Sequence, residues 1–525
     1  MKQKESFFLR VPVLCVAAVL LTAALSVFRA FRMVWVFYDP NIRFLGGAAG
    51  LFLIAAAVLG LLLVLLALRV WKPQNERIAR AKVCRVLGAF GVVFALLFAV
   101  AAVVMIYIAG HETGSVMLLW LKKDLPLILG FVAAAVLLIF LPNCRGRGKA
   151  ALAVCMALVF ALGALWIVFP VMPYRIVSDP VVMDTGEDYA VVFATNTQGT
   201  GFVTYDFDGT DYTVYAQQNG RLVGDRLMHT VHVPYVHLKN NRYSVGSTRV
   251  VEEFSYGGRR GKTVTAGPYT LQVNESAEQT WLVISDWHSY LDDAKKAIFH
   301  LGEYDAVVML GDPAAGMDFE EQAVRNIVQF GGALTGGEIP VLYVRGNHET
   351  RGAFADLLPS YLGYDKLYYT ADRGPYSFLV LDSGEDKPDD HVEYGGMDAY
   401  RQNREQMVDW LKTVKVKNDK LIVLSHAWQV SEPEPALSRA AWDAFSALGA
   451  RFVISGHEHV CRFLPGEKEE EQAYAEAYPG ITAYLDGGHK GKTYVASKLT
   501  LTPQNVRFEA VDNAGNTVVD ETLPW

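Results

Sequence analysis

Hydrophobic residues fall into three successive patterns along the 525-residue chain, and the first is a series of long apolar runs. Five such runs occupy the N-terminal third: Val11–Phe28, Phe44–Leu68, Val86–Ile108, Leu125–Leu141 and Ala150–Val171. Each approaches or exceeds the ~20 residues that an α-helix needs to cross the hydrocarbon core of a bilayer. The pattern therefore predicts that residues 1–173 form an α-helical transmembrane bundle of about five helices.

Basic residues between these runs predict how the bundle is oriented. The N-terminal segment, the second loop and the fourth loop together carry twelve Lys and Arg residues, whereas the opposite loops carry five. Because cytoplasmic loops are enriched in Lys and Arg, the N-terminus is expected in the cytoplasm. After an odd number of crossings, everything beyond Pro173 is expected at the outer face of a plasma membrane. No ionisable residue lies at the centre of a run, so anchoring, lipid access and bundle association stay open as roles for the helices.

The second pattern, in residues 174–276, is an alternation of apolar and polar positions in short segments. The clearest segments are Tyr189–Ala194, Phe202–Phe207, Tyr212–Ala216 and Thr230–Leu238, which are separated by Gly, Asp and Asn turns. Alternation with a period of two predicts strands that bury one face. We therefore expect a β-sandwich of about 100 residues. No nucleophile or metal-ligand cluster is visible in it, so its expected role is to hold the next domain away from the membrane.

The third pattern, in residues 277–525, alternates apolar strands with helical stretches. The strands are Trp281–Ile284, Ala306–Leu310, Val341–Val344, Leu421–Leu424 and Phe452–Ile454, and the helices include Leu291–Leu301 and Phe319–Phe330. Apolar strands that alternate with helices are typical of an α/β sheet covered on both faces. The tail, Thr493–Thr522, returns to strand alternation and is expected to complete a second sheet.

Composition and charge support a composite chain and narrow its functions. Hydrophobic residues make up 52% of the chain and charged residues 20%, which is too much charge for a membrane bundle alone. The 48 basic and 55 acidic residues give a formal net charge of −7, so no binding of duplex nucleic acid is expected. Four of the five cysteines lie in the N-terminal third, which leaves neither a disulfide framework nor a cysteine zinc site.

Polar clusters follow five of the predicted α/β strands at their carboxyl ends. In chain order they are Asp286-Trp287-His288, Gly311-Asp312, Gly346-Asn347-His348-Glu349, Ser425-His426 and Gly456-His457-Glu458-His459. Ligand sites of open α/β folds form at this edge of the sheet, so five separate segments can converge there. Any one cluster alone is typical of a turn, a helix cap or a buried histidine. The complete set, with each cluster behind an apolar strand, indicates one functional site.

The residue types in these clusters are those of a dinuclear metal centre. Such a centre needs several imidazole and carboxylate ligands, including a carboxylate that can bridge two cations. The glycines before Asp312, Asn347 and His457 let the backbone turn sharply and approach the ions closely. Mixed nitrogen and oxygen ligation suits two divalent metal ions such as Mn²⁺, Fe²⁺ or Zn²⁺, and the residue types do not choose among them.

The ordered set resembles the pattern D-x-H, G-D, G-N-H-[DE], H and G-H-x-H of the calcineurin-like metallophosphoesterase superfamily, over roughly Glu278 to Trp525. This resemblance implies a layered α/β/β/α sandwich and hydrolysis of phosphate esters by a hydroxide that bridges two metal ions. It implies that one ion is bound by Asp286, His288 and His459, that the other is bound by Asn347, His426 and His457, and that Asp312 bridges both. It also implies that His348 contacts the phosphate and protonates the leaving oxygen.

Two further resemblances concern Arg345 and the domain order. Arg345 begins the run Arg-Gly-Asn-His-Glu, which is similar to that of the protein serine/threonine phosphatases and implies that its guanidinium reaches phosphate. The alternative is an ion pair of Arg345 with Asp382 or Glu349. A β-sandwich ahead of the catalytic domain is similar to the fibronectin-like module of purple acid phosphatases. Those enzymes have glycine at the position of His288 and tyrosine at that of Ala315, so no tyrosinate–iron colour is expected.

The sequence thus predicts a membrane-anchored, metal-dependent phosphoesterase whose substrate is a phosphate mono- or diester and whose partners include the lipid bilayer. A polar, acidic stretch, Ser383–Gln406, is expected to be either a substrate lid or a solvated surface loop. One alternative function is a phosphodiesterase or nuclease for nucleotide or lipid-headgroup diesters. The other is a membrane sensor that binds metal or a phosphorylated ligand without catalysis. The complete ligand set favours an enzyme, while the loops around the metals decide which ester is cut.

Overall fold

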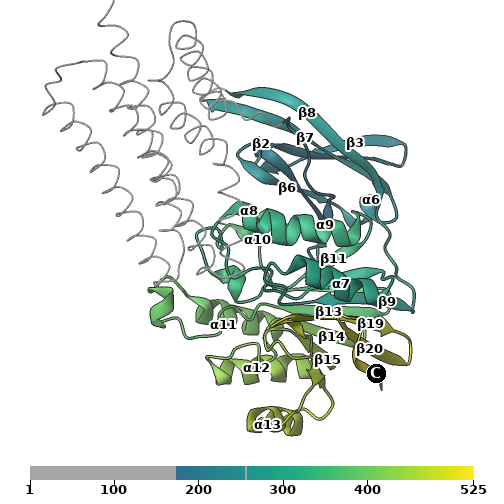
Figure 1. Ribbon diagram of the computed structural model, residues 1–525, viewed down its shortest axis with the longest axis vertical. Helices are drawn as coiled ribbons and strands as arrows, with labels where there is room; N and C mark the ends of the chain where they lie inside the picture. Colours follow the sequence, from purple (N-terminus) through teal and green to yellow (C-terminus); the bar gives the residue numbers. More distant parts are fainter. Residues whose placement is uncertain (1–172, 255–256) are drawn as a thin grey trace, which may run out of the picture. The chain divides into compact units, whose positions relative to one another are not determined.

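Two β-sheets carry most of the described chain, which is residues 173–254 and 257–525 of a computed structural model (Figure 1). The strands of the first sheet are β1 (Val181–Asp184), β2 (Tyr189–Phe207), β3 (Thr210–Tyr215), β6 (Arg226–Val233), β7 (Arg242–Phe254), β8 (Gly257–Thr270), β9 (Gln279–Ile284), β10 (Ala306–Met309), β11 (Pro340–Tyr343), β18 (Gly488–Lys490), β19 (Thr493–Leu501), β20 (Asn505–Asp512) and β21 (Thr517–Pro524). Their order is β21-β20-β19-β9-β10-β11-β1-β2-β7-β8, with β18 beside β19 and with β3 and β6 beside β2. The neighbours β9, β10, β11 and β1 are parallel.

The second sheet is smaller and is also parallel at its centre. Its strands are β12 (Tyr369–Arg373), β13 (Tyr376–Leu381), β14 (Lys420–Ser425), β15 (Ala450–Ser455), β16 (Arg462–Phe463) and β17 (Thr482–Leu485). They lie in the order β12-β13-β14-β15-β17-β16, and β13, β14, β15 and β17 are parallel. A separate hairpin pairs β4 (Gln217–Gln218) with β5 (Arg221–Leu222). The apolar strands expected in residues 277–525 are therefore present, and they form the parallel centres of both sheets.

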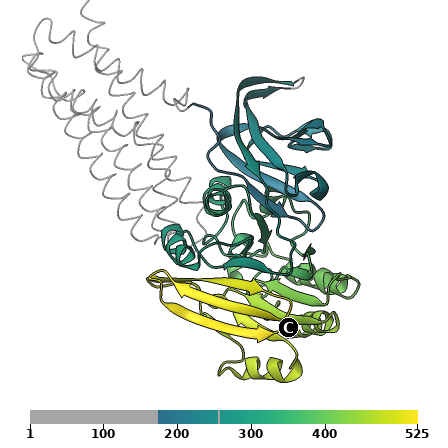
Figure 2. The same cartoon turned by 90° about the vertical axis from the view of Figure 1, so that its right-hand side faces the viewer.

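The two sheets pack face to face, and helices cover their outer faces, so this α/β core is layered α/β/β/α (Figures 1 and 2). Between the sheets, the rings of Trp281 on β9 and Phe378 on β13 lie 4.3 Å apart. On the first sheet lie α7 (Leu291–Leu301) and the continuous stretch of α8 (Glu320–Ala323), η2 (Val324–Gln329) and α9 (Phe330–Thr335). On the second lie α11 (Tyr400–Leu411), α12 (Pro435–Ala447) and α13 (Glu469–Ala477). Short helices α6 (Tyr235–Leu238), η3 (His348–Thr350), α10 (Leu358–Leu362) and η4 (Val392–Tyr394) lie in connections.

Helix α7 shows why the sequence pattern of this region predicted a helix. Its buried residues are Ala294, Ala297, Ile298 and Leu301, which follow the i, i+3, i+4, i+7 spacing of one helix face. Asp292 and Asp293 lie in its first turn, where carboxylates interact favourably with the helix dipole. The predicted bounds of this helix are confirmed.

The alternation predicted a separate β-sandwich in residues 174–276, and the structure joins the strands of this region to the first sheet. Their strands extend the first sheet, because β1 pairs in parallel with β11, Val182 opposite Pro340. Residues 174–525 cluster as one compact unit. The alternation of a strand shows which face is buried but not which strand lies beside it, so the pattern alone could not predict this pairing. A purple-acid-phosphatase-like domain arrangement has no support in this topology.

The C-terminal tail joins the first sheet and not the second, which corrects the predicted placement. β19 pairs antiparallel with β9, Ser497 opposite Val283. In Figure 2 the tail strands, in yellow, lie against the green strands of the second sheet. That contact is made by side chains, such as Phe508 on β20, whose ring centroid is 5.4 Å from that of Phe452 on β15. The alternation therefore predicted strands where β19, β20 and β21 lie, but not the strand with which they pair.

The predicted transmembrane bundle also needs a correction. In the described part of the chain, no helix is both long and apolar enough to cross a membrane. The five predicted spans lie within residues 1–172, outside the described residues. Within the part of the chain that the structure describes, this finding contradicts the transmembrane fold class, the membrane anchor and the plasma-membrane location.

Candidate metal centre

The five polar clusters predicted from the sequence lie together at one edge of the two sheets. Asp286 follows β9, Asp312 follows β10, Asn347 follows β11, His426 follows β14 and His457 follows β15. Because these strands are parallel within each sheet, their carboxyl ends share an edge. Ligand atoms lie within 4.8 Å of one another in three overlapping groups, which are Asp286-His288-His459, His288-Asp312-His348 and Asp312-His426-His457. The remaining predicted ligand, Asn347, has its Oδ1 atom 3.1 Å from His457 Nδ1.

The backbone turns sharply at these residues. Positive φ angles occur at Asp286 (49°), His288 (37°), Asp312 (57°), His457 (69°) and His459 (51°). This left-handed conformation costs a non-glycine residue on the order of 1–3 kcal/mol. Gly311 has a φ of 92°, and a Cβ at that position would lie 2.5 Å from the backbone nitrogen of Gly346. The surrounding packing therefore holds several strained turns in one place, which is typical of a functional site.

The buried carboxylate of Asp286 is the clearest sign of a cation site. Its Oδ1 atom has no hydrogen-bond partner among the described residues. It is surrounded by three imidazole Nε2 atoms, those of His459 at 3.5 Å, His426 at 3.9 Å and His288 at 4.0 Å. Ligand atoms ~2.1 Å from one tetrahedral ion lie about 3.4 Å apart. The donor types and their separations therefore fit a divalent cation between the carboxylate and the rings.

Asp312 lies at the centre of the cluster and faces three histidines. Its Oδ2 atom is 3.2 Å from His426 Nε2, 3.7 Å from His288 Nε2 and 3.8 Å from His348 Nε2. Burial raises the pKa of Asp312, but the positive charge of His426 and His348 outweighs burial and holds this pKa well below its usual range. Burial lowers the pKa of His426, but Asp312 and Asp286 outweigh it and raise this pKa to about 10. The two carboxylates thus attract positive charge strongly.

Backbone carbonyl groups orient three of the imidazole rings. The Nδ1 atoms of His426, His459 and His348 donate to Leu310 O at 2.6 Å, His489 O at 2.5 Å and Ala315 O at 3.0 Å, respectively. A neutral imidazole that carries its proton on Nδ1 keeps a lone pair on Nε2. These partners therefore direct the Nε2 atoms toward the carboxylates as potential ligands or bases.

His457 is oriented the other way round. Its Nε2 atom lies 3.1 Å from Glu432 Oε1, which leaves Nδ1 to face the cluster. A carboxylate on the outer nitrogen of a metal-binding histidine fixes the ring and raises its basicity. Glu432 lies in the loop after β14 and belongs to no recognisable motif, so no sequence pattern predicted its contact with His457.

The amide of Asn347 stands between the cluster and Arg351. One end of the amide is 3.1 to 3.3 Å from Asp312 Oδ2, His426 Nε2 and His457 Nδ1, and the other end is 2.9 Å from Arg351 Nη2. Hydrogen bonds among the protein groups favour the NH₂ group toward the cluster and the oxygen toward Arg351. A cation in the cluster favours the opposite orientation, with the amide oxygen as ligand. The orientation of Asn347 therefore depends on the charge that the cluster holds.

Glu349 ties two of the ligand turns together. Its Oε2 atom accepts from the backbone nitrogen of Asp312 at 3.0 Å, and its Oε1 atom accepts from that of Gly346 at 3.1 Å and from the hydroxyl of Tyr343 at 2.9 Å. The side chain is fully buried. Glu349 thus positions the turns after β10 and β11 relative to each other.

Arg345, which the sequence predicted to reach phosphate, is held in an ion pair. Its Nε and Nη2 atoms donate to the two carboxylate oxygens of Asp382 at 3.0 and 2.6 Å. The structure thus shows the ion pair of Arg345 with Asp382 that the sequence left open as an alternative to a phosphate contact. The stretch Ser383–Gln406 begins beside this pair, and its Glu385 is buried and accepts from Thr350 Oγ1 at 2.6 Å. The start of the stretch is therefore packed against the candidate site.

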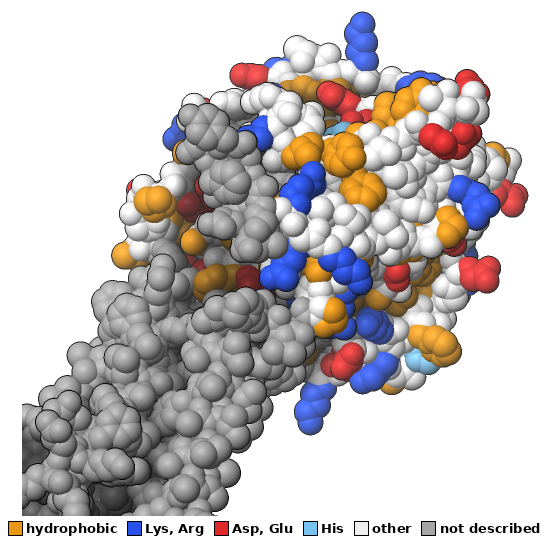
Figure 3. All heavy atoms as spheres, turned by 90° about the horizontal axis from the view of Figure 1, so that it is seen from above, with side chains coloured by type: hydrophobic (Ala, Val, Ile, Leu, Met, Phe, Trp, Pro, Cys, Tyr) orange, Lys and Arg blue, Asp and Glu red, His pale blue; other side chains and the backbone are white. Residues whose placement is uncertain are grey.

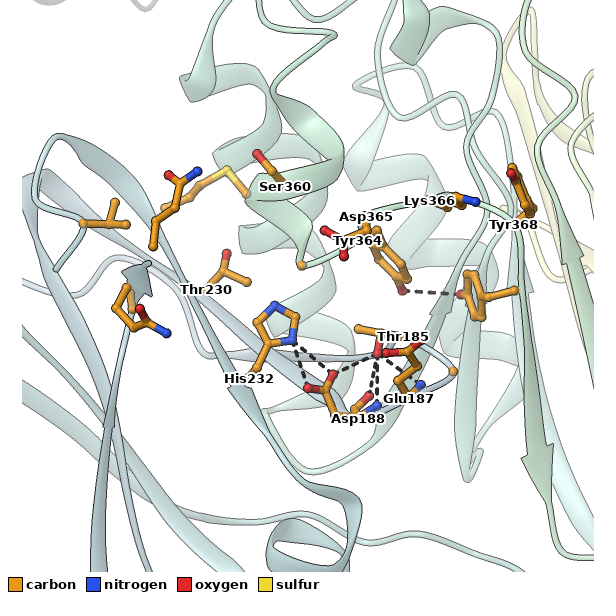
Figure 4. Close-up of a pocket in the computed structure, with 18 of the residues that line it drawn as sticks. Thr185, Glu187, Asp188, Thr230, His232, Ser360, Tyr364, Asp365, Lys366 and Tyr368 are labelled. Atoms are coloured by element: carbon orange, nitrogen blue, oxygen red, sulfur yellow. Dashed lines mark hydrogen bonds and ion pairs between the residues drawn. The ribbon is translucent and has the colours of Figure 1, made fainter. Parts of the chain in front are cut away.

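A cavity of about 790 Å³ is lined by none of these ligand residues (Figure 4). In its wall, His232 Nδ1 lies 3.1 Å from both carboxylate oxygens of Asp188. On the face shown in Figure 3, Lys and Arg side chains form several small groups among acidic and hydrophobic ones. Because the lining of this cavity includes none of the predicted ligands, the cavity is separate from the candidate metal centre.

Comparison with known proteins identifies the family of this region. Residues 280–461 match the family model of the calcineurin-like phosphoesterases, so the chain carries a domain of this family, as its motifs predicted. Members of this family bind divalent metals. None of the curated proteins matches the chain.

Several solved structures resemble the chain at low identity. GAP50, the anchor in the inner membrane complex of Plasmodium, is 12% identical, with a TM-score of 0.35 and with 47% of this chain and 89% of that chain covered. A metallophosphoesterase from Sphaerobacter thermophilus is 14% identical, with a TM-score of 0.24 and coverage of 45% and 88%. YfcE, a phosphoesterase from E. coli, is 13% identical, with a TM-score of 0.22 and coverage of 46% and 98%.

Proposed function

We propose that this protein hydrolyses phosphate esters at a centre that binds two divalent cations. The observation that supports this best is the pair of buried carboxylates, Asp286 and Asp312, which face imidazole Nε2 atoms at 3.2 to 4.0 Å. In this proposal Asp286, His288 and His459 hold one ion, Asn347, His426 and His457 hold the other, and Asp312 is shared. Seven side chains are more than a single tetrahedral ion uses, which favours two ions over one.

Apart from the metal ligands, the proposed reaction needs a group that protonates the leaving oxygen. When bound, divalent cations supply Lewis-acid activation of water and neutralise charge on the phosphoryl oxygens. His348 donates from Nδ1 to the carbonyl of Ala315, so its Nε2 points to the space beside Asp312. In its protonated form this Nε2 delivers a proton to the departing oxygen. Burial lowers the pKa of His348, which makes its protonated form a stronger acid.

The substrate class follows from the same arrangement. A phosphate monoester has three non-bridging oxygens and a diester has two, and both present negative charge to a site that holds cations. The leaving oxygen must lie within hydrogen-bond reach of His348 Nε2. The proposal therefore covers monoesters and diesters, including nucleotide diesters, and the assay below separates them.

The test uses the full purified chain with Mn²⁺ and compares an aryl phosphate monoester with the corresponding bis-aryl diester. We expect hydrolysis of one or both, and Asp312→Asn should abolish it, because the amide cannot supply the shared negative charge. Asp305→Asn is the matched control. Asp305 accepts from the backbone nitrogen and hydroxyl of Thr280 at 2.7 and 2.9 Å, just before β10, and so lies at the opposite end of that strand.

Two results contradict the proposal. One is an Asp312→Asn variant that is as active as the wild type. The other is a wild-type protein that binds Mn²⁺ but hydrolyses none of the monoesters, diesters and nucleotides offered, which would favour a domain that only binds its ligand.

A further inference from the structure

Two arginines flank the Gly-Asn-His-Glu motif, and the structure gives them opposite surroundings. The guanidinium of Arg345 is paired with Asp382 through both Nε and Nη2, and the side chain is 10% exposed. Asn403 Nδ2 donates to the same carboxylate at 2.8 Å. Arg345 is therefore part of an interior network and is not presented to a ligand.

Arg351 is also held by carboxylates, but along one edge of its guanidinium only. Its Nε and Nη2 atoms donate to the two oxygens of Glu385 at 2.8 Å each, and Nη2 also donates to Asp386 Oδ1 at 3.1 Å. Glu385 is buried, and the hydroxyl of Tyr394 donates to it at 2.8 Å. These contacts fix the plane of the guanidinium, because two parallel hydrogen bonds allow little rotation.

The third guanidinium nitrogen, Nη1, faces the candidate site. It lies 3.3 Å from His348 Nε2 and 3.5 Å from His348 Nδ1. The amide of Asn347, a predicted ligand, is 2.9 Å from Arg351 Nη2, so the guanidinium borders the candidate site through this nitrogen too. The Arg351 side chain is 23% exposed, so a ligand can reach it. An oxygen that accepts a proton from His348 Nε2 therefore belongs to a group that is also within reach of Nη1.

We propose that Arg351, and not Arg345, is the arginine that binds the phosphoryl group, an inference that rests on the proposed function. A guanidinium donates to phosphoryl oxygens in a fixed plane and stays charged at any relevant pH. Lys387 Nζ lies 3.1 Å from Asp386 and 3.2 Å from Glu393, so this lysine offsets part of the acidic charge beside Arg351. Glu385 therefore aims Arg351, while Nη1 contacts the ligand.

The competing explanation is that Arg351 only anchors the stretch Ser383–Gln406. Tyr394→Phe separates the two explanations, since it removes hydroxyl contacts to Glu385 at 2.8 Å and to Asp386 at 3.1 Å. This variant loosens the same anchor and changes no atom near His348. Arg351→Lys keeps the positive charge but loses the planar fork.

The experiment measures binding of inorganic phosphate to the full, Mn²⁺-loaded chain by calorimetry, together with metal content and with KM and kcat for the ester that the wild type hydrolyses. We expect Arg351→Gln to weaken phosphate binding and raise KM by at least tenfold with unchanged metal content. Arg351→Lys should fall between the wild type and Arg351→Gln, and Tyr394→Phe should stay within about twofold of the wild type.

The inference is overturned if Arg351→Gln binds phosphate as the wild type does, or if Tyr394→Phe loses as much affinity as Arg351→Gln. It is also overturned if the metal-loaded wild type binds no phosphate. The binding arm is independent of turnover, so a protein that binds phosphate through Arg351 but cuts no ester would refute the proposed hydrolysis and leave the role of Arg351 supported.

Discussion

At the candidate metal centre, one oxygen of the buried Asp286 carboxylate lacks a hydrogen-bond donor within the described chain, whereas the buried carboxylate of Asp184 in the β-rich part is surrounded by donors. Asp184 accepts from Tyr235 at 2.5 Å and from the backbone nitrogen of Gly186 at 2.9 Å, and it forms a buried ion pair with Arg373. At the metal centre, Asp286 Oδ1 has no hydrogen-bond partner among the described residues. Both carboxylates are fully buried, so the difference lies in their partners and not in exposure.

The comparison distinguishes carboxylates that stabilise the fold, such as Asp184, from carboxylates that are available to bind a ligand, such as Asp286. A buried carboxylate with donors on every side contributes to stability, and removing one partner is costly. A buried oxygen without a donor lowers stability unless a ligand supplies the missing positive charge. We therefore expect substitutions in the two regions to have opposite signatures in activity and stability.

The largest expected effect is that of Asp286→Asn on activity. It should lower kcat/KM by more than about 100-fold, since loss of a metal ligand exceeds the 10–100-fold typical of outer-shell partners. The free energy of unfolding without metal should not fall, because the substitution removes a buried charge and keeps an oxygen that can accept from the His457 backbone nitrogen. Ester hydrolysis and urea unfolding in a chelator check both parts. A marked loss of metal-free stability would remove the proposed contrast.

Asp184→Ala is expected to show the reverse signature. Arg373 would lose its buried partner, so the free energy of unfolding should fall by about 3–5 kcal/mol. Activity per folded molecule should stay unchanged, because none of the predicted metal ligands contacts Asp184 in the described hydrogen bonds. Urea unfolding and hydrolysis measured on the same preparation test this. Wild-type stability in the variant would show that the ion pair is not a structural element.

His348→Gln should affect the chemical step alone. We expect kcat to fall by about 10²–10⁴-fold, the range for loss of a general acid. Metal content should be unchanged, because His348 is not among the seven proposed ligands. His232→Gln, in the wall of the cavity lined by none of the ligand residues, is the matched histidine control and should leave kcat unaltered. A lower metal content in His348→Gln than in the wild type would contradict this prediction and would indicate that His348 is a metal ligand.

The smallest of these effects is expected from Glu432→Gln. The amide keeps an acceptor for His457 Nε2 but loses the negative charge that raises the basicity of the ring. Metal affinity should fall by about 10–100-fold. Glu458→Gln serves as control, because Glu458 adjoins His457 in sequence yet pairs with Lys468 at 2.9 Å. Isothermal titration with Mn²⁺ compares them, and equal affinities for both variants would rule out a positioning role for Glu432.

The α/β core could be predicted from the sequence because its signals are local. Helix α7 repeats its buried residues at helical spacing, and strands such as β9 and β10 are short apolar runs. The partners of a strand are not a local property. The pairing of β1 with β11 and that of β19 with β9 join segments far apart in sequence, so the alternation of these segments did not predict either pairing.

In the candidate site, too, the sequence predicted the residues with local signals and did not predict those without them. The predicted ligands are each marked by a strand that ends one or a few residues earlier, and they converge because the strands are parallel. Glu432 and Arg351 have no such mark. Their relation to His457 and His348 depends on the paths of two irregular segments, which periodicity does not encode. Arg345 shows the converse, since a motif match alone suggested a phosphate contact, and the structure shows its guanidinium paired with Asp382.

The most direct test of the central claim is to count metal ions and measure hydrolysis in one preparation of the full chain. After loading with Mn²⁺ and removal of excess metal, mass spectrometry of the metal content should give two ions per chain for the wild type and fewer for Asp286→Asn and Asp312→Asn. Hydrolysis should disappear with a chelator and return when Mn²⁺ is restored. A wild-type chain that binds no divalent metal, or that hydrolyses esters equally well without it, would contradict the two-cation centre.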